Sequence, residues 1–373
     1  MRAVVYRGVN DLRVETVPVP RIRAGELLVK VAVCGVCPTD IKKIQYGTVP
    51  PPRIFGHETA GTIVKLGVGS SKLGFKVGDR VALHHHVPCL DCHFCRHHTF
   101  AQCETYKRTG ITAGFQPAGG GYAEYVRVMP FVLPGVVKIP ARNSFAEGAL
   151  LEPVNTVLKA VRRLSLLRGD VVLVAGQGPI GLIFTRLLQL AGAQVIATDL
   201  MEPRLKLARK FGARRVCLAT QLSTAPRILS GLNPQPSLDS AVIAVPSDAA
   251  VQQALQLVRC GGKVLLFAHT KRIAKSEVQN PKSKVQSHSR PHFSLQPSAF
   301  SLDLASICLD EKDLLGSYSS DFTLQDEVAR LVFSRQLDVR PLISHSFPLE
   351  QTAAAVQLAS RPTVDSLKII VTS

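Results

Sequence analysis

The sequence predicts an α/β protein in which a partly open β-barrel is joined to a doubly wound parallel sheet. Residues 1–150 read as short strands broken by Gly and Pro. From Val154 onward strands alternate with helices, a pattern typical of a parallel sheet. Residues 321–373 return to β character. With 373 residues, 46% of them hydrophobic, the chain is long enough for two cores of ordinary domain size.

The barrel is expected to use segments from both ends of the chain. We expect residues 1–153 and 321–373 to form one domain, with residues 154–320 between them as a second domain. The expected barrel strands are 2–6, 26–33, 61–66, 80–83, 121–128 and, near the C-terminus, 367–371.

The parallel sheet is expected to alternate apolar strands with helices. Its expected strands are 170–175, 194–198, 240–245, 263–268 and 314–318, and its expected helices are 181–191, 205–211 and 249–258. Residues 271–297 are rich in Ser, Lys, Gln and Pro, and they contain a duplication, KSEVQNP followed by KSKVQSH. This segment is expected to be an exposed, flexible insertion.

Charge and hydropathy exclude several classes of protein. The formal net charge of +18 raises the possibility of nucleic-acid binding. However, Lys and Arg are scattered, aromatic residues make up 6% of the chain, and no Trp is present to stack on bases. No apolar run reaches the roughly 18 residues that a membrane helix needs. The chain opens MRAVVYRGVN without a signal peptide, so we expect a cytoplasmic protein that binds neither membrane nor nucleic acid.

Four closely spaced cysteines predict a structural zinc site. Cys89, Cys92, Cys95 and Cys103 follow the pattern C-x2-C-x2-C-x7-C, which lets four thiolates converge on one tetrahedral ion. An iron–sulfur cluster would need a shorter last gap followed by Pro. Disulfides are the other alternative, and they fit poorly with a reducing compartment.

A glycine motif predicts a dinucleotide site. Gly176-Gln-Gly178-Pro179-Ile180-Gly181 follows the strand VVLVA and opens a helix, so the helix N–H groups point at a pyrophosphate. Asp199 ends the next strand, where a carboxylate can bind both ribose hydroxyls of NAD and repel the 2′-phosphate of NADP.

The main alternative for the glycine motif is a turn that serves only packing. Two further residues are candidates for the same site. Arg204 is a candidate contact for the adenosine end of the cofactor, or else a solvated helix residue. Val245 is expected beside the nicotinamide, at the end of its strand.

A second set of metal-binding residues lies outside the cysteine cluster. Cys37, His57 and Glu58 offer a thiolate, an imidazole and a carboxylate, and three ligands leave the fourth position of zinc open for an alcohol or water. Taken singly, His57 would more often be a core or surface histidine and Cys37 a small buried hydrophobe.

At this point the chain resembles the zinc-containing medium-chain dehydrogenase/reductase family, which includes alcohol, sorbitol and threonine dehydrogenases. The resemblance covers nearly the whole length. It rests on GVCPTD (35–40), GHE (56–58), GDRVAL (78–83), the four cysteines, GGGYAEYV (119–126), LLEP (150–153) and GQGPIG (176–181). It implies a GroES-like catalytic domain around a Rossmann domain.

The resemblance assigns roles around the reactive zinc. It implies that Cys37 and His57 are ligands and that Glu58 is a ligand or an exchangeable carboxylate beside the metal. Glu152, in LLEP, matches an acidic position that approaches the zinc directly or through water. Thr39 matches a hydroxyl that bonds the substrate oxygen and starts a proton relay.

Four further positions either have a second interpretation or depart from the pattern of the family. Asp40 matches the carboxylate that orients the histidine ligand, although Thr39 and Asp40 could also cap the next helix. Lys368 matches a basic partner of Glu58 or is a surface strand residue. Lys42 stands where many relatives carry a proton-transferring His. His86 is a candidate substrate contact or part of a solvated loop.

These observations predict an NAD-dependent, zinc-dependent oxidation of a secondary alcohol, either a polyol or an amino alcohol, by a homodimer or homotetramer with two zinc ions per chain. No P-loop and no G-x-S-x-G motif supports other chemistry. Two alternatives remain: a non-catalytic NAD-binding sensor or structural relative, and a basic nucleic-acid-binding protein on the same scaffold.

Overall fold

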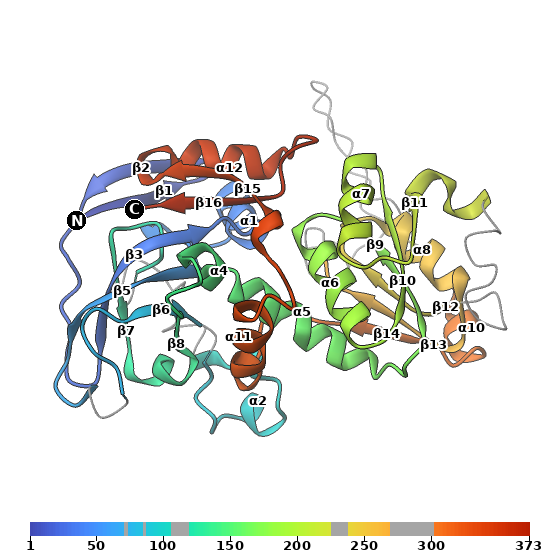
Figure 1. Cartoon of the computed structure of the whole chain (residues 1–373), viewed down its shortest axis with the longest axis horizontal. Coiled ribbons are helices and arrows are strands. Elements are labelled where there is room, and N and C mark those ends of the chain that lie inside the picture. The colour runs from blue at the N-terminus through green and yellow to red at the C-terminus, as the bar shows by residue number, and fades with distance from the viewer. Residues whose placement is uncertain (71–73, 85–86, 106–118, 225–237, 269–301) are drawn as a thin grey trace, which may run out of the picture.

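The computed structural model describes residues 1–70, 74–84, 87–105, 119–224, 238–268 and 302–373. Figure 1 shows two lobes, one built from both ends of the chain and one from its middle. His86 and the insertion predicted at 271–297 lie outside the described residues.

The first lobe contains a mixed sheet and a smaller antiparallel sheet. The larger sheet has the order β15-β16-β3-β5-β6-β8, with β7 also paired to β3, and the smaller has the order β2-β1-β4. The bounds are β1 (Arg2–Gly8), β2 (Asp11–Thr16), β3 (Leu27–Gly35), β4 (Arg53–Ile54), β5 (Glu58–Leu66), β6 (Arg80–Leu83), β7 (Tyr125–Val128), β8 (Val137–Lys138), β15 (Ile343–Pro348) and β16 (Lys368–Thr372). The C-terminal strand therefore completes a sheet that begins near the N-terminus, as Figure 1 shows.

One barrel strand is shorter than predicted. We expected a strand over 121–128, but β7 begins only at Tyr125. The preceding glycines pass close to another backbone segment, since a Cβ on Gly120 would lie 2.3 Å from the carbonyl oxygens of Ile54 and Phe55. Their backbone groups bond this segment instead, as in the 2.8 Å bond from Gly121 N to Gly56 O.

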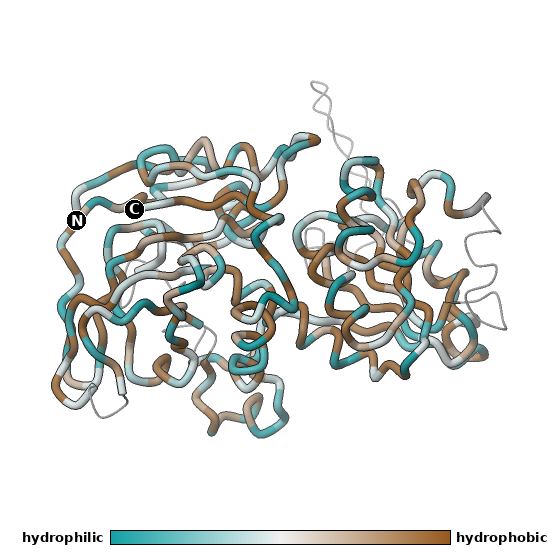
Figure 2. Tube along the Cα trace, viewed as in Figure 1, coloured by the Kyte–Doolittle hydropathy of each residue, from teal (hydrophilic) through white to brown (hydrophobic). Residues whose placement is uncertain are grey.

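The second lobe is built on a six-stranded parallel sheet with the order β11-β10-β9-β12-β13-β14. Its strands are β9 (Val171–Ala175), β10 (Gln194–Asp199), β11 (Arg215–Leu218), β12 (Leu238–Ile243), β13 (Val258–Leu266) and β14 (Asp313–Gly316). Every residue of β9 is buried, which suits a central strand covered on both faces, and Figure 2 shows these strands as mostly hydrophobic. This sheet confirms the predicted doubly wound α/β lobe.

The helices cover the sheets and connect the lobes. They are α1 (Pro38–Tyr46), α2 (His93–Arg96), α4 (Phe145–Ala149), α5 (Leu151–Leu164), α6 (Pro179–Leu190), α7 (Glu202–Lys210), α8 (Asp248–Leu257), α10 (Leu304–Cys308), α11 (Gln325–Phe333) and α12 (Thr352–Ser360). The strand predicted at 263–268 begins earlier, at Val258, because Val258 pairs with Leu238.

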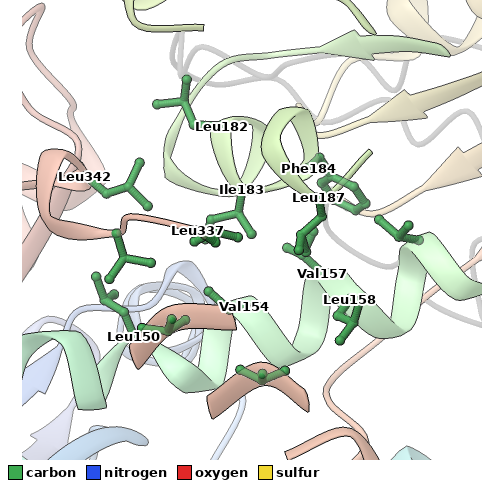
Figure 3. Packing of buried hydrophobic residues seen from close by; sticks show 14 of the residues in the cluster. Leu150, Val154, Val157, Leu158, Leu182, Ile183, Phe184, Leu187, Leu337 and Leu342 are labelled. Atoms are coloured by element: carbon green, nitrogen blue, oxygen red, sulfur yellow. The ribbon is translucent and has the colours of Figure 1, made fainter. Parts of the chain in front are cut away.

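Helix α5 joins the two lobes through one apolar core. Figure 3 shows Val154 and Val157 of α5 on the side that faces Ile183 and Leu187 of α6. The same buried cluster includes residues of both sheets. The predicted boundary at 153/154 falls inside this helix, and the domain limits remain a prediction.

A buried polar network holds the chain where it leaves the parallel sheet. Asn155 of α5 donates to Gln325 Oε1 (3.0 Å) and accepts from Asp321 N (2.8 Å). His84 lies 3.5 Å from the hydroxyl of Ser320. Since Asn155, Ser320 and His84 have no exposed surface, these bonds fix the path of residues 320–325.

Removing the amide of Asn155 should destabilise the protein. Asn155→Ala leaves buried polar groups on Asp321 and Gln325 without their partner, which we expect to cost about 2–3 kcal/mol of unfolding free energy. Urea unfolding followed by circular dichroism measures this cost. The control is Arg163→Ala, an exposed position on the same helix, and equal midpoints for the two variants would contradict the network's role.

Candidate metal centres and cofactor site

Three predicted ligands meet where β3 ends. Cys37 is the N-cap of α1, two residues beyond β3, and its Sγ accepts a bond from Thr39 N (3.5 Å). Gly35, the last residue of β3, pairs with Glu58, the first residue of β5. The ligand atoms of Cys37, His57 and Glu58 therefore all lie within 4.8 Å of one another. Because Cys37 is the cap, the alternative that Thr39 and Asp40 cap this helix is wrong.

Space for the Glu58 carboxylate depends on a glycine. A Cβ on Gly35 would lie 1.9 Å from Glu58 Oε2. The same carboxylate accepts a 2.5 Å bond from Lys368 Nζ, which also donates to Val36 O (2.9 Å). Burial lowers the pKa of Lys368, but the charges of Glu58 and Cys37 outweigh it and the net shift is upward. The structure thus shows Lys368 as a buried partner of Glu58 and excludes the surface-residue alternative.

The His57 ring is held by a buried carboxylate. Its Nδ1 lies 3.2 Å from an oxygen of Asp40, which has no exposed surface. Burial lowers the pKa of His57, but Asp40 and Cys37 outweigh it and raise the pKa well above its usual value. Burial likewise raises the pKa of Asp40, and the adjacent His57 more than offsets it. The surrounding groups favour positive charge at the ring, so the S, N and O donors fit a divalent cation such as zinc.

Glu152 lies near this group without being part of it. It belongs to the first turn of α5, is 6% exposed, and is not among the residues whose ligand atoms converge. Burial raises its pKa to about 7, and His57 opposes the shift while Glu58 adds to it. The charges of the predicted ligands His57 and Glu58 therefore both affect the pKa of Glu152. That Glu152 approaches the zinc, directly or through water, stays a prediction.

Thr39, the predicted start of the proton relay, and Lys42, which replaces the histidine of many relatives, both lie on α1. Thr39 and Lys42 are both half-buried. Burial lowers the pKa of Lys42, and Cys37 opposes that shift. Lys42 is therefore within the electrostatic reach of the predicted zinc ligand.

The four cysteines of the predicted structural site converge in a separate part of the same lobe. Their Sγ atoms lie within 4.8 Å of one another, with Cys92 and Cys95 3.5 Å apart and Cys89 and Cys95 3.9 Å apart. Two thiolates on one tetrahedral zinc would be about 3.8 Å apart, given a Zn–S bond of about 2.3 Å. The structure shows none of the nine cysteines in a disulfide.

The backbone favours a thiolate at this quartet, which we define as Cys89, Cys92, Cys95 and Cys103. Backbone N–H groups of Asp91 and Cys92 lower the pKa of Cys89 to about 6. Burial is the main cause that raises the pKa of Cys95 to about 12. Because zinc binds thiolates and neutralises them, the quartet fits a closed four-thiolate zinc site.

The glycine motif has the geometry of a pyrophosphate site. Gly176 has φ 93°, a left-handed conformation that favours glycine, and it follows β9 directly. A Cβ on Gly181 would lie 1.8 Å from Gly176 O, so the third glycine allows the helix to pack. Gly178 caps α6, Pro179 and Ile180 begin it, and a Cβ on Gly178 would meet open space. These features fit a bound phosphate at the helix N-terminus.

Asp199 lies beside this turn. Its carboxylate accepts bonds from Gln177 N (2.6 Å) and Met201 N (2.9 Å). Arg204 Nη1 lies 3.9 Å from the same carboxylate, and its Nη2 donates to Ser366 O (3.4 Å). Arg204 is thus held at the turn and is not a free surface residue.

Val245 also lies at the carboxyl edge of the sheet. A Cβ on Gly176 would meet its side chain at 2.3 Å. The predicted cofactor residues therefore lie together, at the edge where ligands of doubly wound sheets bind.

Tyr318 is a candidate site residue that the sequence motifs do not identify. It was assigned to the end of a strand, but β14 ends at Gly316 and Tyr318 lies just beyond, with its carbonyl accepting from Lys159 Nζ (2.9 Å). Burial raises the pKa of Tyr318, and the charges of His57 and Cys37 act on it. Tyr318, which is half exposed, therefore lies just beyond the carboxyl edge of the parallel sheet and within electrostatic reach of the predicted metal ligands. Its position directly after the last parallel strand is the sequence feature that could have identified it, because ligands bind beyond the carboxyl ends of such strands.

Comparisons with protein families match both lobes. Residues 23–141 match the alcohol dehydrogenase GroES-like domain, and residues 179–290 match the zinc-binding dehydrogenase domain.

Individual relatives match along the whole chain. A sorbitol dehydrogenase of Bombyx mori is 30% identical, covering 96% of this chain and 94% of the relative. A sorbitol dehydrogenase of Bacillus subtilis (strain 168) is 29% identical, covering 100% and 97%. A crystal structure of a zinc-binding dehydrogenase from Sinorhizobium meliloti 1021 bound to NADP superposes with a TM-score of 0.81 at 25% identity, covering 100% and 99%. Within the described residues, no helix has the length and apolar character needed to cross a bilayer.

The two cysteine-containing centres should behave differently when one ligand is removed. Elemental analysis should find two zinc ions in the purified chain and one in either Cys37→Ser or Cys95→Ser. Only Cys95→Ser should lower the thermal unfolding midpoint substantially, because a closed thiolate site contributes directly to folding.

The matched control is Cys260→Ser, an exposed thiol in the other lobe that should keep both ions. One ion or none in the unmodified chain would contradict the assignment of two sites. A large midpoint loss in Cys37→Ser alone would mean that the sites are exchanged.

Proposed function

Because the chain belongs to the zinc-containing medium-chain dehydrogenase/reductase family, we propose that it transfers a hydride from a secondary alcohol to NAD. The reaction takes place at a centre formed by Cys37, His57, Glu58 and Glu152. The observation that carries the proposal is the open donor set of Cys37, His57 and Glu58. Tyr318 lies just past the carboxyl edge of the parallel sheet, and the charges of His57 and Cys37 affect its pKa.

The chemistry divides between the bound groups and the chain. Zinc held by these donors would act as a Lewis acid and lower the pKa of the alcohol, and NAD would accept the hydride. Thr39, on the first turn of α1, accepts the proton of the substrate hydroxyl while it passes its own hydroxyl proton on toward solvent. Asp40 fixes the orientation of His57, and Lys368 balances the charge of Glu58. Lys42, half-buried on the same helix, is a candidate for passing the proton to solvent.

We propose NAD in preference to NADP. The Asp199 carboxylate lies against the glycine turn, where it can accept the ribose hydroxyls and repel a 2′-phosphate. Arg204 partly offsets this charge from 3.9 Å, and the solved relative mentioned above binds NADP. The preference is therefore a balance between these two side chains.

We propose a polyol or another small secondary alcohol as the substrate, since both curated relatives reported above are sorbitol dehydrogenases. Nine unbridged cysteines suit a reducing compartment such as the cytoplasm. A homodimer or homotetramer is the proposed assembly. A purely structural or nucleic-acid-binding role is less favoured, because the open metal-binding set is intact.

A screen of alcohols tests the proposed function. The purified chain should reduce NAD, followed by absorbance at 340 nm, with at least one of a set of polyols, threonine and simple secondary alcohols. Cys37→Ser should abolish this reduction, because one of the metal ligands is lost, whereas Cys260→Ser should retain it. No reduction with any member of the set, in a chain that carries both zinc ions, would contradict the proposal.

Removal of the Asp199 carboxylate should change the cofactor preference. In Asp199→Ala the ribose loses its acceptor and Arg204 loses its counter-charge, so kcat/KM should fall about tenfold for NAD and rise for NADP, a change of about 1.4 kcal/mol for each tenfold factor. Steady-state kinetics with both cofactors measure the change. Glu202→Gln, an exposed acid in the first turn of α7, is the control, and an unchanged NAD/NADP ratio in Asp199→Ala would refute the role.

A further inference from the structure

Two histidines face solvent on the lobe that carries the cysteine quartet. His93 and His97 are four residues apart, and the backbone bond from His97 N to His93 O (3.3 Å) shows that a helical turn connects them. Residues four apart on a helix lie on the same face. Both side chains are exposed, whereas Cys95, on the other face of this turn, is buried.

The two rings are close enough to share one metal ion. Their centroids are 4.5 Å apart, with an interplanar angle of 60°. An imidazole nitrogen binds a transition metal at about 2.0–2.1 Å and lies about 1 Å from its ring centre, so two rings in cis or tetrahedral positions on one ion have centres about 4.5–5 Å apart. The observed separation falls at the lower end of this range.

Bringing the nitrogens to one point needs only a rotation of the rings. The second side-chain torsion of histidine turns the ring about an axis that passes near its centroid, so the separation of the centroids is nearly kept. This torsion is soft, with broad minima. Both rings are exposed, so solvent leaves room for the rotation and for water ligands.

The positive charge nearest to the pair in sequence is offset by an acidic partner. Arg96 is the positive residue between the two histidines in sequence, and its guanidinium is paired with Asp91 (3.1 Å). Both partners are exposed, so solvent and salt screen what charge remains.

We propose that His93 and His97 form an exchangeable binding site for a divalent transition-metal ion, outside the two centres described above. Two imidazoles select borderline ions such as Zn²⁺, Ni²⁺ and Cu²⁺ over Mg²⁺ and Ca²⁺, which prefer oxygen ligands. Water completes the coordination. An ion held by two imidazoles exchanges faster than one held by four thiolates, so this lobe carries a labile ion beside a resident one.

Nickel binding to the zinc-loaded chain tests the site. Equilibrium dialysis of the untagged protein against NiCl2 should show one bound ion that is absent from H93Q/H97Q. Each single variant should weaken this binding at least tenfold. The control is His98→Asn, a third imidazole of the same lobe whose ring lies against Phe100; its φ of 54° is left-handed, and Asn tolerates that conformation.

The outcomes separate loss of the site from damage to the lobe. Retention of both zinc ions by H93Q/H97Q, together with loss of the nickel ion, supports the site. Nickel binding of unchanged number and affinity in that variant overturns it. Should the variant lose quartet zinc, crystals of the unmodified chain soaked in NiCl2 decide: an anomalous peak between His93 and His97 supports the proposal, and its absence refutes it.

Discussion

The proposed catalytic centre is a cluster of ionisable groups that the fold withdraws from water. Asp40, His57, Glu58 and Lys368 are each 5% exposed or less, and burial of unpaired charge costs far more than a domain can supply. Each group is therefore placed against an opposite charge, with Asp40 at His57 and Lys368 at Glu58. The strand registry brings these charged groups together. Glu58 opens β5, Lys368 opens β16, and both strands flank the end of β3, so that the C-terminal strand is required to neutralise a carboxylate near the N-terminus.

This dependence explains which parts of the fold could be predicted from sequence. The apolar runs of β9 and β10 fix strands within one residue, because a central strand must be hydrophobic on both faces. The glycines before β7 read as part of a strand, but they lie against the backbone of residues 54–56, which only the tertiary structure shows. Likewise β13 starts at Val258 because it meets Leu238 of a neighbouring strand. Local pattern predicts whether an element exists, and pairing decides where it begins.

The residues of the candidate site also divide into those that sequence motifs predict and those whose role depends on tertiary packing. Sequence motifs identified Cys37, His57 and the quartet. The quartet needs only local turns to converge, because its ligands are close in sequence, whereas Cys37 and His57 are brought together by the pairing of β3 with β5. Tyr318 was missed because its role depends on where the parallel sheet ends relative to the other lobe. Glu152 was found by motif, yet its distance from the ligands depends on how α5 packs. The bonds of Asn155 and Lys159 hold the segment that carries Tyr318, so one helix positions residues on both sides of the site.

The two cysteine-containing centres differ in how their charge is satisfied. At the quartet, backbone N–H groups bond Cys89, and four thiolates would fill the coordination of a zinc ion. At the proposed catalytic centre, the ligand atoms of Cys37, His57 and Glu58 converge, and Glu152 is not among these three residues. Burial raises the pKa of Glu152 to about 7. A closed site needs no further ligand and can lie far from the cofactor edge. An open site is useful only where substrate and cofactor meet, and the proposed catalytic centre lies within electrostatic reach of Tyr318, just past the carboxyl edge of the parallel sheet. Phe100 of the quartet lobe contacts Phe322, four residues after Tyr318, with ring centroids 5.6 Å apart. The closed centre therefore supports the segment that borders the open one.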